Sequence, residues 1–377
     1  MLPIAIRRTV RGWNRVYRET RTVGMALKSK RHPVLAHVCV IRRCNLACTY
    51  CSEFDDYSKA VPTQDLLDRI DRLADLGTTA VTLTGGEPLL HPEIEKVLAR
   101  IRQRGMMAVM VTNGYLLNVA KIEKLNKSGI DRMQISIDNV RPDDVSKKSL
   151  KVLDMKLRWL SEHAEFPVNI HSVVGACSEH PEDALTIAQR AKDLGLISTV
   201  GIIHDDTGQL KPLNAEQQRV VEEIEALNKP LFSFTRHNPW RKNLVQGLPN
   251  DWHCGAGGRH LYICENGLVH YCMAQRGYPA IPLAQYGQAD LDRERETKKD
   301  CAPYCTIFCI QRVALVDELR DSPKQTLLKL FPGDVPGAEP KLPLAVKVLS
   351  KMLPATKSKP ASTRVFTKAA QKLLNIQ

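Results

Sequence analysis

The stretch that decides the fold is Cys44-Asn45-Leu46-Ala47-Cys48-Thr49-Tyr50-Cys51, in which three cysteines have the spacing C-x3-C-x2-C. It comes directly after residues 36–41, a short apolar run typical of a buried strand. Three thiolates on such a loop can hold three corners of an iron–sulfur cubane and leave one iron open, as a catalytic metal site requires. A zinc site without its fourth ligand, or unrelated buried cysteines, would show the same spacing. The stretch therefore predicts a metal-binding loop at the carboxyl end of a strand.

Strand and helix patterns alternate regularly along residues 34–204. Short runs rich in Val and Ile, apolar on both faces, are typical of a parallel sheet that helices cover. Amphipathic stretches between these runs predict crossover helices with right-handed connections. A partial barrel and an open doubly wound sheet fit this pattern equally well, and both place active residues at the carboxyl ends of the strands. We expect strands at residues 36–41, 79–83, 107–112, 132–137, 168–174 and 198–203.

A second motif, Gly85-Gly86-Glu87-Pro88, comes after the second expected strand. Two glycines let a backbone approach a ligand closely, and a carboxylate can pair with an ammonium group. Together with the cysteine motif, in which Tyr50 takes the aromatic place, it resembles the radical SAM superfamily and its signature C-x3-C-x-aromatic-C. The resemblance covers residues 34–205 and implies an α/β fold, a partial (β/α)6 barrel. It also implies that the glycine motif binds the methionine amine of S-adenosylmethionine (SAM).

The resemblance implies further cofactor contacts at the ends of later strands. Asn113 ends the third expected strand, and Ser136 and Asp138 end the fourth. Val174 ends the fifth, where the family places backbone contacts to adenine. Each of these residues would also be ordinary as a helix cap or a core residue. With Tyr50, they make up the expected cofactor site.

The resemblance also implies a mechanism. Cys44, Cys48 and Cys51 would hold a [4Fe–4S] cluster whose open iron SAM chelates. One electron from a flavodoxin- or ferredoxin-type reductant would cleave SAM, and the 5′-deoxyadenosyl radical would abstract hydrogen from an unactivated C–H bond of the substrate. The cofactors supply this chemistry, while the protein orients the substrate and excludes water. The sequence identifies no residue that takes part in the later hydrogen transfer.

A second group of cysteines lies in residues 253–315. Twelve residues separate Cys254 from Gly267 and four separate Gly267 from Cys272, and Asn266-Gly267 between two apolar runs is a strong hairpin signal. This spacing resembles the SPASM or twitch domain, whose hairpin carries an auxiliary [4Fe–4S] cluster. The later cysteines depart from the full pattern of that domain, and six cysteines cannot fully ligate two cubanes. We expect at least one auxiliary cluster, or a zinc-stapled hairpin, from Cys254, Cys264, Cys272, Cys301, Cys305 and Cys309.

The net charge of +13 is concentrated at the two ends of the chain. Residues 1–32 and residues 341–377 each carry +8, which leaves residues 33–340 at −3. Because the body is mildly acidic, no basic channel for nucleic acid is expected there. This charge favours binding of the two ends to an anionic partner.

Both basic ends have amphipathic patterns. Val10, Trp13 and Tyr17 recur at helical spacing beside a stripe of arginines, and the tail sets Phe366 and Leu373 against lysines. Such helices suit an anionic membrane surface, although a helix docked on the protein's own body would show the same periodicity. Because we see neither a secretory h-region nor a run of about 20 apolar residues, we expect a cytoplasmic protein, peripheral on the inner face of a membrane.

Three functions compete. The basic ends favour a lipid, isoprenoid or small molecule as the substrate, as does a segment before the barrel that is too short for a peptide-binding wing. A peptide- or protein-modifying SPASM maturase is the alternative, and a non-catalytic iron–sulfur or zinc protein is an alternative of another class. We divide the chain into a basic amphipathic segment (1–33), a radical SAM core (34–211), a helical connection (212–252), a SPASM- or twitch-like hairpin domain (253–315) and a basic tail (316–377).

Overall fold

A single nine-stranded sheet organises the part of the chain that the structure, a computed structural model, describes: residues 3–330 without 52, 177, 206 and 228–237. The strand order is β6-β5-β4-β3-β2-β1-β7-β8-β9, so the sheet is open, with β6 and β9 at its edges. The first six strands pair in parallel. They are β1 (Leu35–Ile41), β2 (Ala80–Gly85), β3 (Met107–Thr112), β4 (Arg132–Ser136), β5 (Val168–Gly175) and β6 (Ile197–Ile203). Each agrees with an expected strand to within two residues, and the α/β fold with a partial barrel is confirmed.

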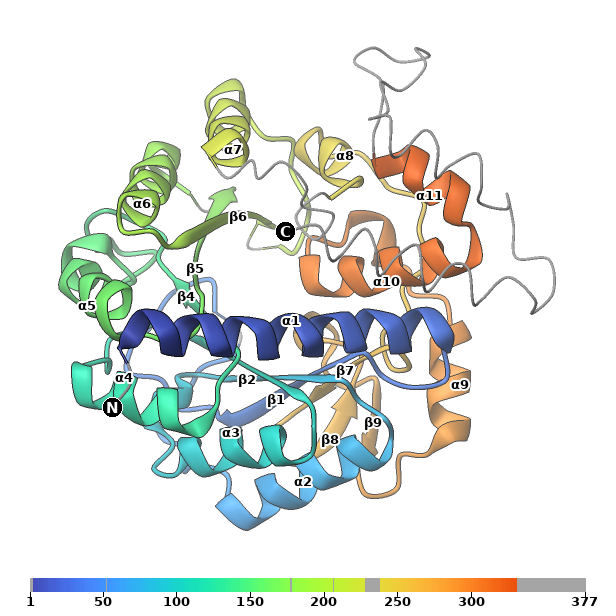
Figure 1. Cartoon of the computed structure of the whole chain (residues 1–377). Coiled ribbons are helices and arrows are strands. Elements are labelled where there is room, and N and C mark those ends of the chain that lie inside the picture. Colours follow the sequence, from blue (N-terminus) through green and yellow to red (C-terminus); the bar gives the residue numbers. More distant parts are fainter. Residues whose placement is uncertain (1–2, 52, 177, 206, 228–237, 331–377) are drawn as a thin grey trace.

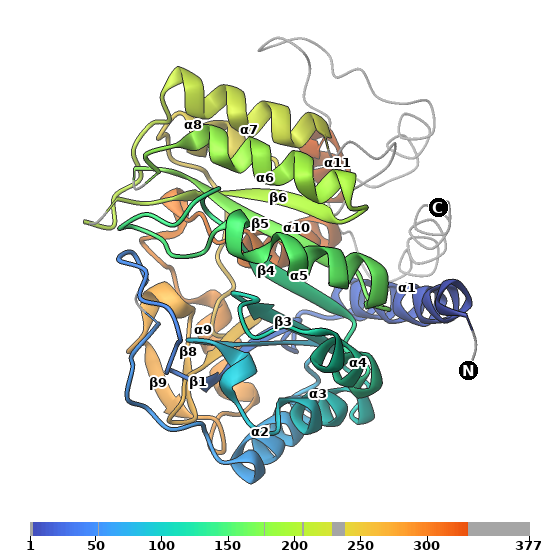
Figure 2. The ribbon, with the colours of Figure 1, turned by 90° about the vertical axis from the view of Figure 1, so that its left-hand side faces the viewer.

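Helices alternate with these strands along the chain and cover the outer face of the sheet (Figures 1 and 2). They bury apolar residues at helical spacing, such as Leu66, Ile70 and Leu73, against the strands in a large core, and α7 packs in a second cluster with α6. On the inner face, strand residues such as Gln134 and His171 are only partly buried. The helices are α2 (Thr63–Asp75), α3 (Ile94–Gln103), α4 (Val119–Ser128), α5 (Leu150–His163), α6 (Pro181–Asp193) and α7 (Ala215–Leu227).

The cysteine-rich hairpin continues the same sheet. Strand β7 (His260–Ile263) pairs in parallel with β1, and β8 (Leu268–His270) and β9 (Pro279–Pro282) extend the sheet as antiparallel neighbours. The expected turn at Asn266-Gly267 is present, and Gly267 takes the positive φ of +77° that favours glycine there. The hairpin region is therefore built onto the core rather than set apart from it.

The remaining helices pack around the hairpin and the inner side. They are α1 (Ile4–Lys28), α8 (Arg241–Val245), α9 (Gln288–Glu296), α10 (Phe308–Asp321) and α11 (Pro323–Leu330), with short 3₁₀ turns at Pro88–Leu90, Met273–Gln275 and Ala302–Tyr304. Residues 316–330, which we assigned to the tail, lie in α10 and α11. The tail pattern around Phe366 and Leu373 lies outside the described residues. No helix among those described is long and apolar enough to cross a bilayer.

Helix α1 lies on the body of the protein beside α10 (Figure 1). Arg7 and Arg11 both form ion pairs of 2.6 Å with Glu165, which is largely buried. Arg18 donates through Nε to Asp131 at 2.9 Å. The arginine stripe is therefore used within the protein, and the membrane interpretation of that stripe does not hold for these residues.

The opposite side of α1 presents apolar side chains to solvent. Ile6, Val10, Trp13 and Tyr17 are between 46% and 70% exposed, and they lie on one side at helical spacing. We call these four residues the outer stripe. A helix that turns arginines toward the protein and exposes its aromatic residues is the reverse of the usual arrangement, so the outer stripe needs an explanation.

Candidate active site

Three thiols lie on the loop that leaves the carboxyl end of β1. Cys44, Cys48 and Cys51 are all free, and the loop is fixed by a hydrogen bond of 2.9 Å from Cys44 N to Asp55 O. Burial raises the pKa of Cys44 and of Cys51, and a neighbouring thiol adds to each rise, Cys51 for Cys44 and Cys48 for Cys51. A positive metal centre offsets such a raised pKa because it binds the thiolate. The donor set therefore fits a cluster with three sulfur ligands and one open iron.

Asn113 joins the end of β3 to this loop. Its Nδ2 donates to Asn45 Oδ1 at 2.8 Å and lies 3.6 Å from Cys44 Sγ. The backbone N–H of Leu46 also points at Cys44 Sγ, at 3.4 Å. Hydrogen bonds to a cluster sulfur tune its potential, so the expected site residue Asn113 is placed to act on a bound cluster.

The two glycines of the second motif hold β2 against the start of the cysteine loop. A Cβ on Gly85 would lie 2.1 Å from Ile41 O, and one on Gly86 would lie 2.1 Å from Arg42 O. Gly86 N donates to Ile41 O at 2.8 Å, and Glu87 N donates to Arg43 O at 3.1 Å. The close approach that requires glycine here is an approach to the protein's own backbone, at the residues that lead into Cys44.

Gly86→Ala should therefore disrupt the loop. The added methyl group meets backbone on two sides, so we expect the variant to lose most of the iron bound at Cys44, Cys48 and Cys51. Iron content after anaerobic reconstitution measures this loss. Gly12→Ala in α1 is the matched control, because nothing lies within 4 Å of its added Cβ and alanine favours a helix by roughly 0.5–1 kcal/mol. Full iron content in Gly86→Ala would contradict the backbone argument.

Glu87 is completely buried, and its carboxylate is held by the protein. Thr112 Oγ1 donates to it at 2.6 Å, Asn113 N at 2.7 Å and Leu89 N at 2.9 Å. Burial raises the pKa of Glu87, and these donors oppose the rise. Its carboxylate thus ties the end of β2 to the end of β3, and its pairing with the SAM ammonium group stays a prediction.

A buried polar network lies behind Tyr50. Asp138 accepts hydrogen bonds from Tyr50 Oη and from Ser146 Oγ, the latter at 2.7 Å, and forms an ion pair of 3.1 Å with Lys148. Lys148 also lies over the Tyr50 ring, 4.8 Å from its centre. Burial alone would lower the pKa of Lys148, but Asp138 and then Tyr50 raise it above the ordinary value. Ser146 Oγ lies 3.6 Å from Cys48 Sγ, so the network reaches the cysteine loop.

Sequence reasoning missed Ser146 and Lys148. They lie on the loop between β4 and α5, where Lys147-Lys148-Ser149 is typical of ordinary solvent-exposed charge. Only the fold shows that this loop crosses the cysteine loop, with Thr49 N donating to Val145 O at 3.0 Å. Lys148 therefore supplies a buried positive charge beside the thiols.

Two other expected cofactor residues lie on separate strands. Ser136 is half-exposed at the end of β4. Val174 is fully buried among apolar residues of α6 and α7, so only its backbone is available to a ligand. Their contacts with SAM stay predictions.

Four of the six hairpin-region cysteines come together. They are Cys254, Cys272, Cys301 and Cys305. Burial is the largest cause of the raised pKa of Cys305, to which the other three thiols add, and of the pKa of Cys272, which rises to about 12 with contributions from Cys254 and Cys301. We call these four cysteines the cysteine quartet. Four thiols without an open position fit a closed site, either an auxiliary [4Fe–4S] cluster or zinc.

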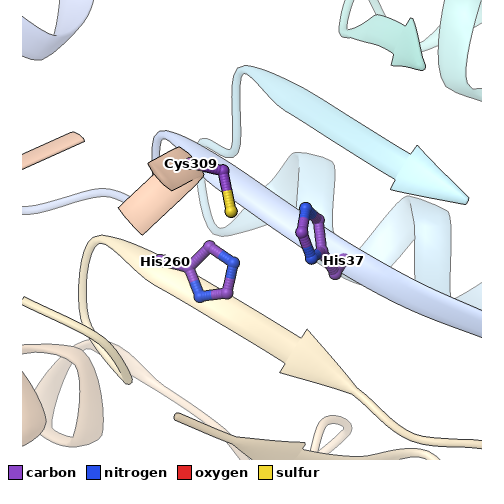
Figure 3. Close-up of side chains that lie close together, drawn as sticks. All are labelled: His37, His260 and Cys309. Carbon is purple, nitrogen blue, oxygen red and sulfur yellow. The ribbon is translucent and has the colours of Figure 1, made fainter. Parts of the chain in front are cut away.

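The other two expected ligands take different positions. Cys264 is buried beside Cys39 and Tyr262. Cys309 lies in the first turn of α10 and packs against the cluster of buried residues that contains Cys254 and Cys272, with its sulfur near two histidines (Figure 3). Cys264 therefore lies apart from the quartet and Cys309 borders it, and metal ligation by either thiol stays a prediction.

Residues 38–207 match the sequence profile of the Radical SAM superfamily, and this part of the chain is a radical SAM domain. Radical SAM domains bind a [4Fe–4S] cluster and SAM, in agreement with the cofactors expected from the sequence. Its sequence is similar to two peptide cyclases that act on PqqA. Identity is 27% over 251 residues with the protein of Methylorubrum populi, covering 63% of this chain and 65% of that protein. With the protein of Granulibacter bethesdensis it is 30% over 139 residues, covering 35% and 37%.

Other similarities are narrower or concern the fold alone. GTP 3′,8-cyclase of Microcystis aeruginosa is 39% identical over 120 residues, covering 29% of this chain and 36% of that protein. The matched segments thus span between about a third and two thirds of these relatives. SuiB of Streptococcus suis, solved with SAM, aligns with a TM-score of 0.53 over 76% of this chain and 75% of that chain, at 17% identity. The same protein bound to its precursor peptide SuiA gives 0.51 over 87% and 75%, at 15% identity.

Proposed function

We propose that this protein is a radical SAM enzyme that abstracts hydrogen from a peptide or protein side chain. The observation that carries the proposal is that one sheet brings two sets of cysteines together. They are the open three-cysteine loop at β1 and the cysteine quartet beside β7. The alignment with the PqqA peptide cyclase of Methylorubrum populi covers 251 residues and is therefore longer than the radical SAM domain, residues 38–207. These observations favour the peptide alternative over the lipid or small molecule that the basic ends suggested.

The residues of this chain have separate tasks in that reaction. Cys44, Cys48 and Cys51 would hold the cluster, and a bound cluster with SAM supplies the one-electron chemistry. Asn113 donates through Nδ2 toward Cys44 Sγ, and Lys148 places a positive charge near Cys51. The inner faces of the strands, which are partly buried, would lie against the substrate. The quartet would hold an auxiliary cluster, which would supply an acceptor for the electron released on oxidation. A flavodoxin- or ferredoxin-type protein would deliver the first electron.

The test uses anaerobically reconstituted enzyme, a chemical reductant, SAM and synthetic peptides from the small reading frames that adjoin the gene. We expect 5′-deoxyadenosine to form, and one peptide to lose two hydrogens by mass spectrometry. Deuterium at the reacting carbon should appear in the deoxyadenosine. Formation of deoxyadenosine with no change in any peptide would overturn the peptide assignment while leaving the SAM chemistry intact.

A second candidate, a membrane-held lipid substrate, is favoured by the outer stripe of α1. Trp13 and Tyr17 are 69% and 70% exposed, and aromatic side chains of this kind insert at the headgroup level of a bilayer. The protein would then work at the cytoplasmic face of a membrane. Lipid vesicles distinguish this candidate from the first.

We expect Trp13 emission to shift to the blue with anionic vesicles if the outer stripe inserts. Trp13→Ser and Tyr17→Ser should then release the protein from vesicles in a sedimentation assay, while Met155→Ser should not, because Met155 is an exposed apolar residue on α5. Binding that survives 1 M salt would indicate insertion of the outer stripe, because at that salt concentration the attraction between charges is screened over a distance of about 3 Å. Unchanged emission at low salt would rule out insertion.

A further inference from the structure

Two histidines and a cysteine meet where β1, β7 and α10 adjoin. His37 and His260 come from neighbouring strands of the sheet, and Cys309 comes from the first turn of α10 (Figure 3). One ligand atom from each of the three side chains lies within 4.8 Å of the other two. The imidazole rings meet edge to face, with their centres 5.0 Å apart. Three residues of metal-binding type thus converge from distant parts of the sequence.

The hydrogen bonds of His260 show which nitrogen is free. Its Nδ1 lies 3.0 Å from the carbonyl oxygen of Tyr271, and a carbonyl can only accept, so Nδ1 carries the proton. Its Nε2 is then a bare lone pair, and it is buried without a hydrogen-bond partner among the described residues. An unmatched buried acceptor is unfavourable in a folded protein. A backbone carbonyl on one ring nitrogen is also how proteins orient a histidine that binds metal through the other.

We propose that His37, His260 and Cys309 bind a single thiophilic divalent cation, with Zn²⁺ as the best-fitting ion. Two imidazole nitrogens and one thiolate are a donor set that zinc prefers, at about 2.0–2.1 Å for nitrogen and 2.3 Å for sulfur. Around a tetrahedral ion with those bonds, ligand atoms lie roughly 3.3–3.7 Å apart, so the side chains need to close by about 1 Å. Such a movement is within the reach of side-chain rotation.

Cys309 suits this role better than ligation of an auxiliary cluster. Cys309 packs against the cluster of buried residues that contains Cys254 and Cys272, but the quartet already offers four thiols, which is enough for a cubane without it. Burial raises the pKa of Cys309, and a bound cation would offset that rise because it binds the thiolate. Cys309 lies at the start of α10, a helix of 14 residues, and a helix N-terminus also favours the thiolate form. The site is independent of the proposed substrate, because none of its three residues belongs to the cysteine loop or the quartet.

The test is the metal content of the full-length protein, purified anaerobically and loaded with Zn²⁺ or Co²⁺ after reconstitution with iron. We expect roughly one zinc per chain besides the cluster iron, and a thiolate-to-cobalt absorption band when Co²⁺ replaces it. His37→Ala and Cys309→Ser should each reduce zinc to about a tenth or less and leave iron unchanged. Cys264→Ser, another buried thiol of the hairpin, is the matched control and should keep both metals.

His37→Ala keeps the proposal testable even if Cys309→Ser fails to fold. His37 lies on β1, far in sequence from the quartet, so loss of zinc with full iron there can only come from this site. Loss of about four irons in Cys309→Ser, with zinc retained, would make Cys309 a cluster ligand and overturn the proposal. Wild-type protein that takes up neither Zn²⁺ nor Co²⁺ would also overturn it.

Discussion

Cys44→Ala, Cys48→Ala and Cys51→Ala should each abolish the reductive cleavage of SAM. Each variant removes one of three sulfurs that would hold the cluster, and no other described cysteine is placed to replace it on the loop. We expect the loss of about four irons per chain and of all 5′-deoxyadenosine above background. Iron analysis and chromatography of the products measure both.

Cys39→Ala is the matched control for these variants. Cys39 lies five residues before Cys44 on β1, and it is also a free, buried thiol. Its sulfur approaches a backbone carbonyl, Ile41 O, at 3.6 Å, so it is already engaged within the strand. We expect the control to keep its iron and its activity. Deoxyadenosine production in any of the three loop variants would refute the assignment of the cluster.

Removing a member of the cysteine quartet should have the second large effect. Cys272→Ser or Cys305→Ser breaks a closed four-thiol site, so we expect iron to fall from about eight atoms per chain to about four. Cleavage of SAM should continue, because the three-cysteine loop lies on a different part of the sheet. Modification of the substrate should stop, since the electron released on oxidation would lose its acceptor.

The same variants decide between iron and zinc in the quartet. A protein without Cys44, Cys48 and Cys51 keeps the quartet alone, and we expect it to hold about four irons. If that triple variant binds zinc and no iron, the auxiliary cluster is wrong and the quartet is a structural zinc site.

Much of the fold was predictable because the sheet is parallel and covered by helices. Its first six strands are buried on the outer face, so they appear as short apolar runs at a regular spacing. The cysteine loop and the glycine motif were also predictable, because each comes directly after such a run. The pairing of β7 with β1 was not, since it joins residues more than 200 positions apart and no local pattern marks it.

The division of the later cysteines could not be predicted from spacing either. Cys305 and Cys309 stand four residues apart, yet only the sulfur of Cys309 lies beside two histidines. This difference depends on where α10 begins and on the pairing of β1 with β7, which brings the two histidines together. Lys148 was missed for a similar reason, because its burial depends on a loop crossing that the sequence does not mark.

The placement of β7 has a consequence for the order in which the chain is made. Until residues 260–263 leave the ribosome, β1 has a neighbour on one side only, so a nascent chain carries its cysteine loop on an exposed sheet edge. Arg259, just before β7, is completely buried and donates to Asp317 at 2.8 Å, so its burial also waits for α10. A growing chain would therefore carry an unpaired sheet edge beside its three loop thiols until residues 260–263 are synthesised, which makes this interval the natural moment for a chaperone to bind it.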